Sequence, residues 1–271
     1  MSLELLRVED DGRAGAEAVR DGKIAGRLVA ALREDAVRGR HAWAALGDHE
    51  LAPDEEPALY RGLYEVAAEN WVAEGYLDHY VVVPARADVL EAWYSLSFAQ
   101  QQVHAALALD PVAGRVPDGF TVRIGGSDDL ETAMALAFVI FDHQAGPPTW
   151  AGAPAPSEEE ARASYAEYLA EPGVTYFVAE RGEEPLGHLI LERVSETAIE
   201  LTIAATVLAV RGLGVGSALT DLALGWAYEQ GYRTCITDWR SANLVSSRFW
   251  ARRGFEPTAY RLFRRIELTA R

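Results

Sequence analysis

Hydrophobic and polar positions follow more than one period along the first 110 residues. Apolar side chains recur at helical spacing over residues 13–46 and 57–74, which predicts amphipathic helices in both segments. Residues 78–83 are rich in β-branched and aromatic side chains and predict a strand, and residues 87–96 predict another helix. We therefore expect a helix-rich N-terminal region.

A segment without periodicity, residues 110–119, ends this region. It carries two prolines and two glycines, which interrupt helices and strands. The pattern changes there from mainly helical to mainly strand-like. We therefore predict two domains, over residues 1–112 and 119–271.

The second domain mixes strands with helices. Ser157 begins one helix, because a serine at the N-cap and Glu160 three residues later form a capping box. The predicted strands are 120–124, 174–180, 186–194, 198–208, 234–238 and 258–267, and the other predicted helices are 128–141, 214–230 and 241–253. This order indicates an α+β domain with a largely antiparallel sheet.

One part of this pattern occurs twice. Near residue 75 and near residue 231, a predicted helix ends in Gly-Tyr and is followed by a strand, a second helix and a phenylalanine. The matching residues are Gly75, Tyr76, Trp93 and Phe98 in the first copy and Gly231, Tyr232, Trp250 and Phe255 in the second. A duplicated helix–strand–helix unit explains the match, and chance similarity between amphipathic segments is the alternative.

The composition excludes several classes of protein. Cys235 is the one cysteine, so no intrachain disulfide and no paired-cysteine metal site can form. The six histidines show no metal-binding spacing, and we predict no metal. Lys23, the one lysine, matches no P-loop, pyridoxal-phosphate or protein-kinase context. We expect Cys235 to be a small buried strand residue.

Charge and hydropathy indicate where the protein acts. The formal net charge of −16 opposes nonspecific nucleic-acid binding and suits a cationic or neutral small substrate, although such a charge more often serves solubility. The longest apolar run, residues 133–141, is about half of a bilayer span, and the N-terminus has no secretory-signal pattern. We expect a cytoplasmic protein without membrane or nucleic-acid partners.

The most informative stretch runs from a predicted strand through Arg211-Gly-Leu-Gly-Val-Gly-Ser into a long helix. Gly212, Gly214 and Gly216 let the backbone approach a ligand closely. The free N–H groups and the dipole of the helix favour a phosphate or pyrophosphate there, and Arg211 adds a positive charge. A dinucleotide site requires G-x-G-x-x-G, which these glycines do not follow, and a P-loop requires a lysine.

The remaining spacing, Arg-x-x-Gly-x-Gly, resembles the acyl-CoA pyrophosphate loop of the GCN5-related N-acetyltransferase (GNAT) superfamily. A second family pattern, Asn-x-x-Ser-x-x-hydrophobe-aromatic, is matched by Asn243, Ser246, Phe249 and Trp250, and the helix closes at Gly254-Phe255. The resemblance covers about residues 119–271. Together with the repeat, it implies a tandem-GNAT chain whose N-terminal unit is a degenerate, helix-rich copy without a cofactor site.

The resemblance implies a GNAT fold, which is a mixed, mostly antiparallel sheet flanked by helices. In that fold two parallel strands diverge, acyl-pantetheine lies between them like an added strand, and the following amides hold the pyrophosphate. The residues that the resemblance implies for binding acetyl-CoA are Thr206, Val207, Leu208, Arg211, Gly212, Leu213, Gly214, Val215, Gly216, Ser217, Asn243, Ser246, Phe249 and Trp250.

The resemblance also implies acyl transfer to an amine, in which a general base takes a proton from the ammonium group of the incoming acceptor. Glu200 is our first candidate, because a carboxylate in that strand can face the cleft, and an outward-facing, non-functional carboxylate is the alternative. Asp142, His143 and His188 are weaker candidates. The first two begin the segment where the family places its variable substrate-binding loop.

The general acid is less clear from the family pattern. Many members use a tyrosine four residues before the Gly of Gly-Phe, where this chain has Trp250. An indole N–H can donate a hydrogen bond but does not give up its proton at neutral pH. Ser246 or Ser247 could hydrogen-bond the leaving sulfur, and Tyr260 is the nearest phenol in the sequence.

These residues predict an acyl-CoA-dependent N-acyltransferase, with acetyl-CoA as donor, that acts on an amine of a small molecule or peptide by direct attack on the thioester. A non-catalytic acyl-CoA sensor or regulatory protein on the same fold is the alternative, favoured by the absent tyrosine. A hydride-transfer enzyme with a dinucleotide on the glycine turn is a third hypothesis. Trp150 and Trp239 are candidates for the border of the acceptor pocket, and the chain suits a monomer or a homodimer.

Overall fold

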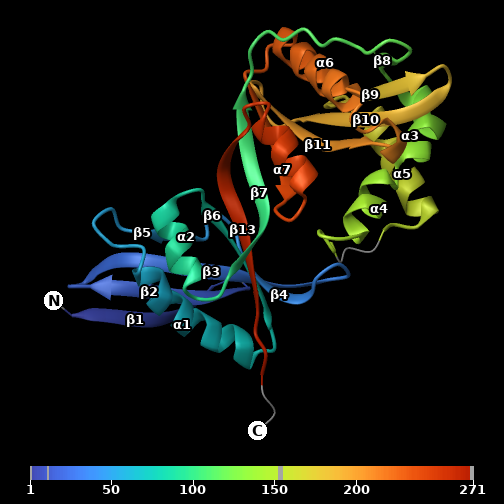
Figure 1. Ribbon diagram of the computed structural model, residues 1–271. Helices are drawn as coiled ribbons and strands as arrows, with labels where there is room; N and C mark the ends of the chain where they lie inside the picture. Colours follow the sequence, from blue (N-terminus) through green and yellow to red (C-terminus); the bar gives the residue numbers. More distant parts are fainter. Residues whose placement is uncertain (1, 11, 152–154, 269–271) are drawn as a thin grey trace. The chain divides into compact units, whose positions relative to one another are not determined.

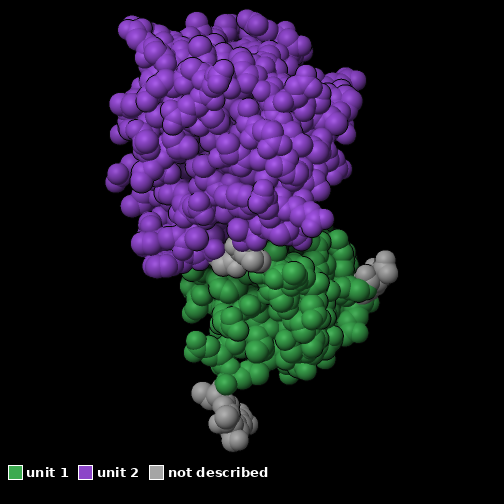
Figure 2. All heavy atoms as spheres, turned by 90° about the vertical axis from the view of Figure 1, so that its right-hand side faces the viewer, with its two compact units in different colours: residues 1–104, 257–271 green, residues 105–256 purple. Residues whose placement is uncertain are grey.

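A computed structural model describes residues 2–10, 12–151 and 155–268 of the chain (Figure 1). The chain forms two units (Figure 2). Unit 1 contains residues 1–104 and 257–271, and unit 2 contains residues 105–256. The described residues include no helix long and apolar enough to cross a membrane.

Unit 1 is built on a strongly twisted sheet. Its strand order is β1-β2-β3-β4-β6-β13, in which β4 and β6 are parallel and the other neighbours are antiparallel; β5 pairs with β3. The strands are β1 (Leu3–Asp10), β2 (Arg13–Arg20), β3 (Lys23–Asp35), β4 (Gly39–Ala44), β5 (His49–Leu51), β6 (Asp78–Pro84) and β13 (Glu256–Arg265), and β7 (Ala99–Ala108) begins in this unit. The helices are α1 (Leu59–Ala73) and α2 (Ala87–Tyr94).

Both helices pack on one face of this sheet. Leu63 and Trp71 of α1 and Trp93 of α2 are fully buried in a core that also contains Leu262 of β13. The indole Nε1 of Trp71 donates a hydrogen bond of 2.8 Å to the carbonyl of Ala14. This bond ties α1 to β2 through the core.

The predicted helix over residues 13–46 is wrong, and so is the expectation of a helix-rich first unit. The segment forms β2, β3 and β4. Ala14, Ala16 and Ala18 are buried at every second position, which is the period of a strand face. Alanine has a high intrinsic helix propensity, so the alanine-rich pattern favoured a helix until sheet pairing decided otherwise. The helix over 57–74, the strand over 78–83 and the helix over 87–96 are confirmed as α1, β6 and α2.

Unit 2 has the predicted α+β arrangement. Residues 105–108 of β7 adjoin β12, and the strand order continues as β12-β11-β10-β9-β8. The strands are β8 (Thr121–Ile124), β9 (Val174–Arg181), β10 (Glu184–Arg193), β11 (Ala198–Thr206) and β12 (Thr234–Arg240). The helices are α3 (Leu130–Leu136), α4 (Val139–Ala145), α5 (Glu158–Ala170), α6 (Val215–Glu229) and α7 (Leu244–Ala251), with short 3-10 turns at Ser127–Asp129 and Leu208–Val210.

Helices cover both faces of this sheet. On one face, Leu136 of α3 and Tyr165 of α5 pack against Tyr176 and Ile190. On the other face, Phe177 meets Trp226 of α6 edge to face, with ring centroids 5.7 Å apart. The predicted helix over 128–141 is divided into α3 and α4, whereas the capping box of Ser157 and Glu160 is confirmed.

The repeated pattern corresponds to a repeated order of elements. α1, β6, α2 and β7 follow one another in the same way as α6, β12, α7 and β13. Their last strands are exchanged, since β13 pairs with β6 in unit 1 and the end of β7 adjoins β12 in unit 2. The two units therefore differ from the predicted domain ranges 1–112 and 119–271, which stay a prediction.

Because β13 belongs to the core of unit 1, a change near the C-terminus should weaken that unit. Leu262→Ala removes a fully buried side chain and is expected to lower the free energy of unfolding by about 2–5 kcal/mol. Hydrogen exchange in β6 should rise with it. Leu268→Ala, at an exposed position, serves as the control and should change stability by less than about 0.5 kcal/mol. An unchanged β6 in Leu262→Ala would contradict the assignment.

Candidate active site

The site begins where two parallel strands separate. β11 and β12 pair over four residue positions, from Ala198 with Thr234 to Leu201 with Thr237, although both strands continue (Figure 1). The hydroxyl of Thr237 donates a hydrogen bond of 2.9 Å to the carbonyl of Leu201 and closes the paired part. A bulge at Thr202 follows at once in the pairing of β11 with β10.

Beyond the bulge, β11 keeps one partner and loses the other. It pairs with β10 as far as Thr206, which lies opposite Gly187. Its other edge, over residues 203–206, therefore presents backbone N–H and C=O groups that β12 does not take. A ligand with amide groups can pair with such an edge as an added strand does.

The glycine turn then leads into α6. Gly212 and Gly214 have φ values of +81° and +87°, a left-handed conformation that favours glycine. Gly214 is the N-cap of α6 and offers no side chain, and the first turn carries no acidic residue. The first N–H groups of α6 thus lack intrahelical partners and the local field suits an anion. This geometry agrees with the predicted pyrophosphate loop.

α7 packs near the first turns of α6. Asn243 caps the helix by accepting a hydrogen bond of 3.1 Å at Oδ1 from the backbone N–H of Ser246. Phe249 Cε2 lies 3.9 Å from the position that a Cβ on Gly216 would occupy, so its ring borders the loop. The guanidinium of Arg253 stands over that ring at 3.8 Å and pairs with Asp221 of α6 at 3.4 Å.

Trp250 occupies a different environment from Phe249. Its side chain is buried and packs edge-on against Phe249 and Phe255, with centroids 4.8 and 5.3 Å apart. Its predicted contact with the acyl-pantetheine arm therefore stays a prediction. Exposed apolar side chains are found in the loop region, at Leu208 and Leu213, and at the start of α7, at Leu244 and Val245. The sequence patterns did not single out Leu244 and Val245.

Glu200 lies at the start of β11 among other acids. Glu192 of β10 is its direct cross-strand neighbour. Burial, followed by the charges of Asp238 and Glu192, raises the pKa of Glu200 above the usual range of a glutamate. A raised pKa brings a carboxylate closer to the operating range of a general base. Glu192 and Asp238 were not predicted, because only strand register brings them to Glu200.

α4 contains the start of the predicted substrate-binding segment and also contacts the glycine turn before α6. Its first residue, Val139, and the preceding Phe138 pack in the same cluster as Ile203 and Val207. Arg211 Nη1 lies 3.4 Å from Nδ1 of His143. His143 therefore lies beside the predicted pyrophosphate loop, and Asp142 is exposed on the same helix.

Two other candidates have core surroundings. Tyr260 belongs to β13 and packs against the core of unit 1, so its predicted role stays a prediction. His188 is fully buried between Tyr165 and Tyr176, and burial lowers its pKa to about 4. Such a histidine stays neutral and is part of the core.

The two tryptophans proposed for the acceptor pocket differ in exposure. Trp150 is exposed, whereas Trp239 is largely buried and donates from Nε1 to Ser247 Oγ at 3.1 Å. Ser247 is therefore engaged within α7, since its hydroxyl also bonds the carbonyl of Asn243. Among the described residues, no group of three His, Cys, Asp or Glu side chains is arranged to hold a metal ion.

Unit 1 repeats the strand separation but fills it with its own side chain. β4 and β6 also pair over four positions, from His41 with Asp78 to Ala44 with Val81. The carbonyl of the next residue, Val82, accepts a hydrogen bond of 2.7 Å from Nε2 of the buried His49. Nδ1 of His49 in turn lies 3.1 Å from the hydroxyl of Tyr60.

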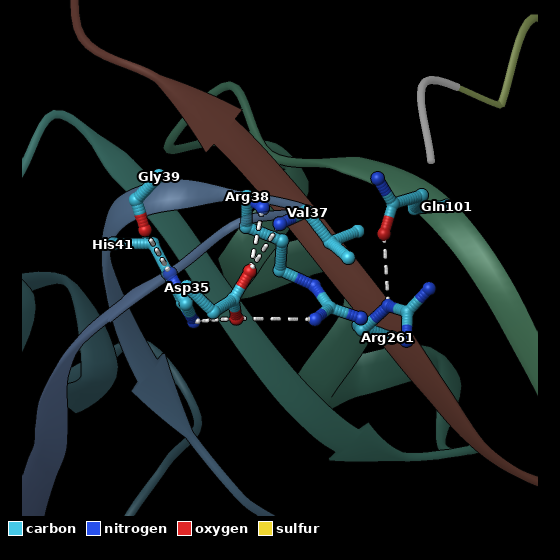
Figure 3. Close-up of polar contacts among 7 residues, drawn as sticks. All are labelled: Asp35, Val37, Arg38, Gly39, His41, Gln101 and Arg261. Carbon is cyan, nitrogen blue, oxygen red and sulfur yellow. Dashed lines mark hydrogen bonds and ion pairs between the residues drawn. The ribbon is translucent and has the colours of Figure 1, made fainter. Parts of the chain in front are cut away.

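The side chains around the β4–β6 pair also differ in charge from those around β11 and β12, because arginines replace the acids. The third position of β4, which Glu200 holds in β11, is Trp43. The guanidinium groups of Arg33, Arg38 and Arg261 stand 5.8, 5.3 and 5.6 Å from its ring. Figure 3 shows how two of them are held. Arg38 Nη1 lies 3.5 Å from Oδ2 of Asp35, and Arg261 Nε donates to Gln101 at 2.8 Å.

Comparisons with known proteins agree with this geometry. Residues 140–255, which lie within unit 2, match the acetyltransferase (GNAT) family. A GCN5-related N-acetyltransferase from Sphaerobacter thermophilus is similar in structure with a TM-score of 0.64 and 16% identity, over 94% of this chain and 82% of the other. No protein of curated function matches the sequence.

Two further solved structures are similar over most of the chain. A tandem GNAT protein from the clavulanic acid biosynthesis pathway has a TM-score of 0.55 and 18% identity, over 95% of this chain and 84% of its own. A GCN5-related N-acetyltransferase from Kribbella flavida has a TM-score of 0.53 and 16% identity, over 96% and 88%. At these identities the likeness establishes the fold, and the predicted GNAT fold is confirmed.

The burial of Cys235 allows a direct test of its predicted inertness. Its thiol is buried, and burial raises its pKa to about 12. We expect no reaction of the folded protein with a chromogenic disulfide reagent at pH 8, and full reaction in denaturant, because the thiolate is the reacting species. Ser195→Cys, on an exposed turn, is the control and should react at once. Rapid labelling of Cys235 in the folded protein would contradict the buried assignment.

Proposed function

From the match of residues 140–255 to the acetyltransferase (GNAT) family, we propose that the chain transfers an acetyl group from acetyl-CoA to a positively charged amine of a small molecule or peptide. The observation that carries the proposal is the separation of β11 from β12 directly before a glycine-capped helix. An unpaired strand edge and an anion site in sequence fit an acyl-pantetheine arm and its pyrophosphate.

In this proposal the backbone does most of the binding. The free edge of β11, over residues 203–206, pairs with the pantetheine amides, because the N–H of Val207 already donates to Leu186 and Leu208 begins a 3-10 turn. The N–H groups from Gly214 to Ser217 hold the pyrophosphate, with Arg211 beside it, since the N–H of Leu213 donates to Val210. Phe249 borders the arm. Asn243 keeps its carbonyl oxygen on the α7 cap, so its amide NH₂ is the group left to donate. The exposed leucines around the loop gain apolar contact when the ligand binds.

The reaction itself is a direct transfer. The amine nitrogen attacks the thioester carbonyl carbon, a C–N bond forms, the C–S bond breaks, and the sulfur leaves as thiolate. Glu200 accepts the proton that the ammonium must lose, directly or through water. Ser246 is the proposed hydrogen-bond donor to the leaving sulfur. Tyr260 is not proposed for this step, because it packs in the core of unit 1.

The acids around Glu200 indicate what kind of amine is accepted. Glu192, Glu200 and Asp238 lie on three neighbouring strands, close enough to raise the pKa of Glu200. A cationic acceptor relieves the repulsion between them. We therefore expect acceptors with more than one positive charge, such as polyamines or aminoglycosides, to react faster than amines that carry no further charged group.

Unit 1 is proposed to bind no acyl-CoA. His49 is hydrogen-bonded to the carbonyl of Val82, the first residue beyond the β4–β6 pairing. The segment before α1 is acidic, and its Glu55 pairs with Arg20 at 2.6 Å. An acidic segment opposes a pyrophosphate. Calorimetry should therefore give one CoA per chain.

Release of free thiol from acetyl-CoA in the presence of polyamines, aminoglycosides and amino acids tests the activity. The buried Trp250 at the usual tyrosine position favours a second candidate, an acyl-CoA sensor without catalysis. Tight CoA binding with no transfer to any amine would support the sensor and contradict the enzyme.

The left-handed glycine of the loop provides a sharp test of binding. Gly214→Ala should weaken CoA binding by about five- to thirtyfold, because alanine disfavours this conformation by about 1–2 kcal/mol and turns the first amides of α6 away. Gly119→Ala is the matched control, since Gly119 also has a left-handed φ, of +82°, and lies in open space. It should lower stability in the same way without changing CoA affinity. Equal effects of both changes would sink the assigned loop.

Glu200→Gln tests the base. We expect kcat to fall by about 10²–10⁴-fold and the loss of activity at low pH to disappear from the profile. The folded-state pKa of Glu200 is raised, so its contribution to stability is present at low pH and lost as the pH rises through that pKa. The variant should therefore be more stable than the wild type at neutral pH. Glu196→Gln, on the exposed turn before β11, is the control. If Glu200→Gln still lost activity at low pH as the wild type does, Glu200 would be excluded as the base.

A further inference from the structure

Arg211 is hydrogen-bonded to an imidazole. Its Nη1 lies 3.4 Å from Nδ1 of His143, and a guanidinium can only donate, so Nδ1 is the acceptor of this bond. Among the described residues, no carboxylate lies within ion-pair distance of Arg211. No ion pair within this part of the chain therefore balances its charge, although it stands beside the proposed anion-binding loop.

α4, the helix that carries His143, is weakly packed against the rest of the unit. α4 has no buried residue. Phe138 and Val139 anchor its beginning next to Ile203 and Val207, whereas His143 lies in its last turn, where the bond to Arg211 is formed. Segments with little buried apolar surface open at low free-energy cost, so one hydrogen bond matters here.

We propose that Arg211 exchanges partners when the donor binds, and that this exchange couples the donor site to the acceptor helix. The inference rests on the proposed function. The pyrophosphate takes the guanidinium, because a charge-assisted bond between a cation and an anion is stronger than a bond from the same cation to a ring nitrogen. His143 loses its donor and the end of α4 is released. Its Nδ1 then becomes an acceptor for the incoming ammonium, so acetyl-CoA binds before the amine.

The coupling has a sign that can be measured without knowing the acceptor. In the free protein the Arg211–His143 bond must be broken before CoA binds fully, so removing the bond should tighten CoA. A net hydrogen bond corresponds to about a two- to twelvefold change in affinity. Pantetheine lacks the pyrophosphate and should leave the bond intact.

The experiment is hydrogen exchange of peptides covering α4, with CoA or pantetheine, together with calorimetry of CoA binding. In the wild type, CoA should raise exchange at residues 142–145 and pantetheine should not. His143→Phe keeps a ring but has no acceptor atom, so its α4 should exchange fast without ligand and its CoA affinity should rise by about two- to twelvefold. His143→Asn restores an acceptor oxygen near the Nδ1 position and should restore the wild-type behaviour.

Gln144→Ala, on the same helix, is the control and should behave as the wild type. Protection of α4 by CoA, an equal response to pantetheine, or failure of His143→Asn to restore the response would each overturn the inference while CoA binding stands. Absence of CoA binding to the wild type would instead overturn the proposed function, and this inference with it.

Discussion

A parallel strand pair that separates inside a sheet leaves backbone hydrogen-bonding groups without partners, which is unfavourable unless something else satisfies them. β11 and β12 separate after four positions, and the rest of unit 2 is arranged around that break. The hydroxyl of Thr237 ends the paired part, the bulge at Thr202 redirects the strand, and the glycine turn places the start of α6 beyond it. An extended ligand with amides and a terminal anion satisfies both the edge and the helix.

Unit 1 shows that the same backbone break can be satisfied from within. β4 and β6 also pair over four positions, but His49 donates to the next carbonyl and is itself held by Tyr60. Burial lowers the pKa of His49, so the ring stays neutral and fits its buried place. On the same strand pair, Trp43 stands where unit 2 has Glu200. The two units thus share a framework and differ in the groups that chemistry requires.

The features of the site run against stability, as functional sites commonly do. Left-handed glycines enlarge the conformational freedom of the unfolded chain, Leu208 and Leu213 remain exposed, and the acids around Glu200 repel one another. Elsewhere unit 2 follows local rules closely, with a capping box at Ser157 and apolar faces on α3 and α5. The contrast between these regions agrees with assigning the activity to the strand break and its loop.

Local sequence determined much of this protein. Local patterns predicted four features, because each depends on residues a few positions apart. These are the glycine turn, the asparagine at the start of α7, the capping box of Ser157 and the repeated helix–strand–helix pattern. Only the tertiary structure decided that residues 13–46 are strands and that β13, which carries Tyr260, completes the sheet of unit 1. It also brought Glu192 and Asp238 to Glu200 and His143 to Arg211. These outcomes depend on pairing between distant segments, and that pairing energy is not written in the spacing of any one segment.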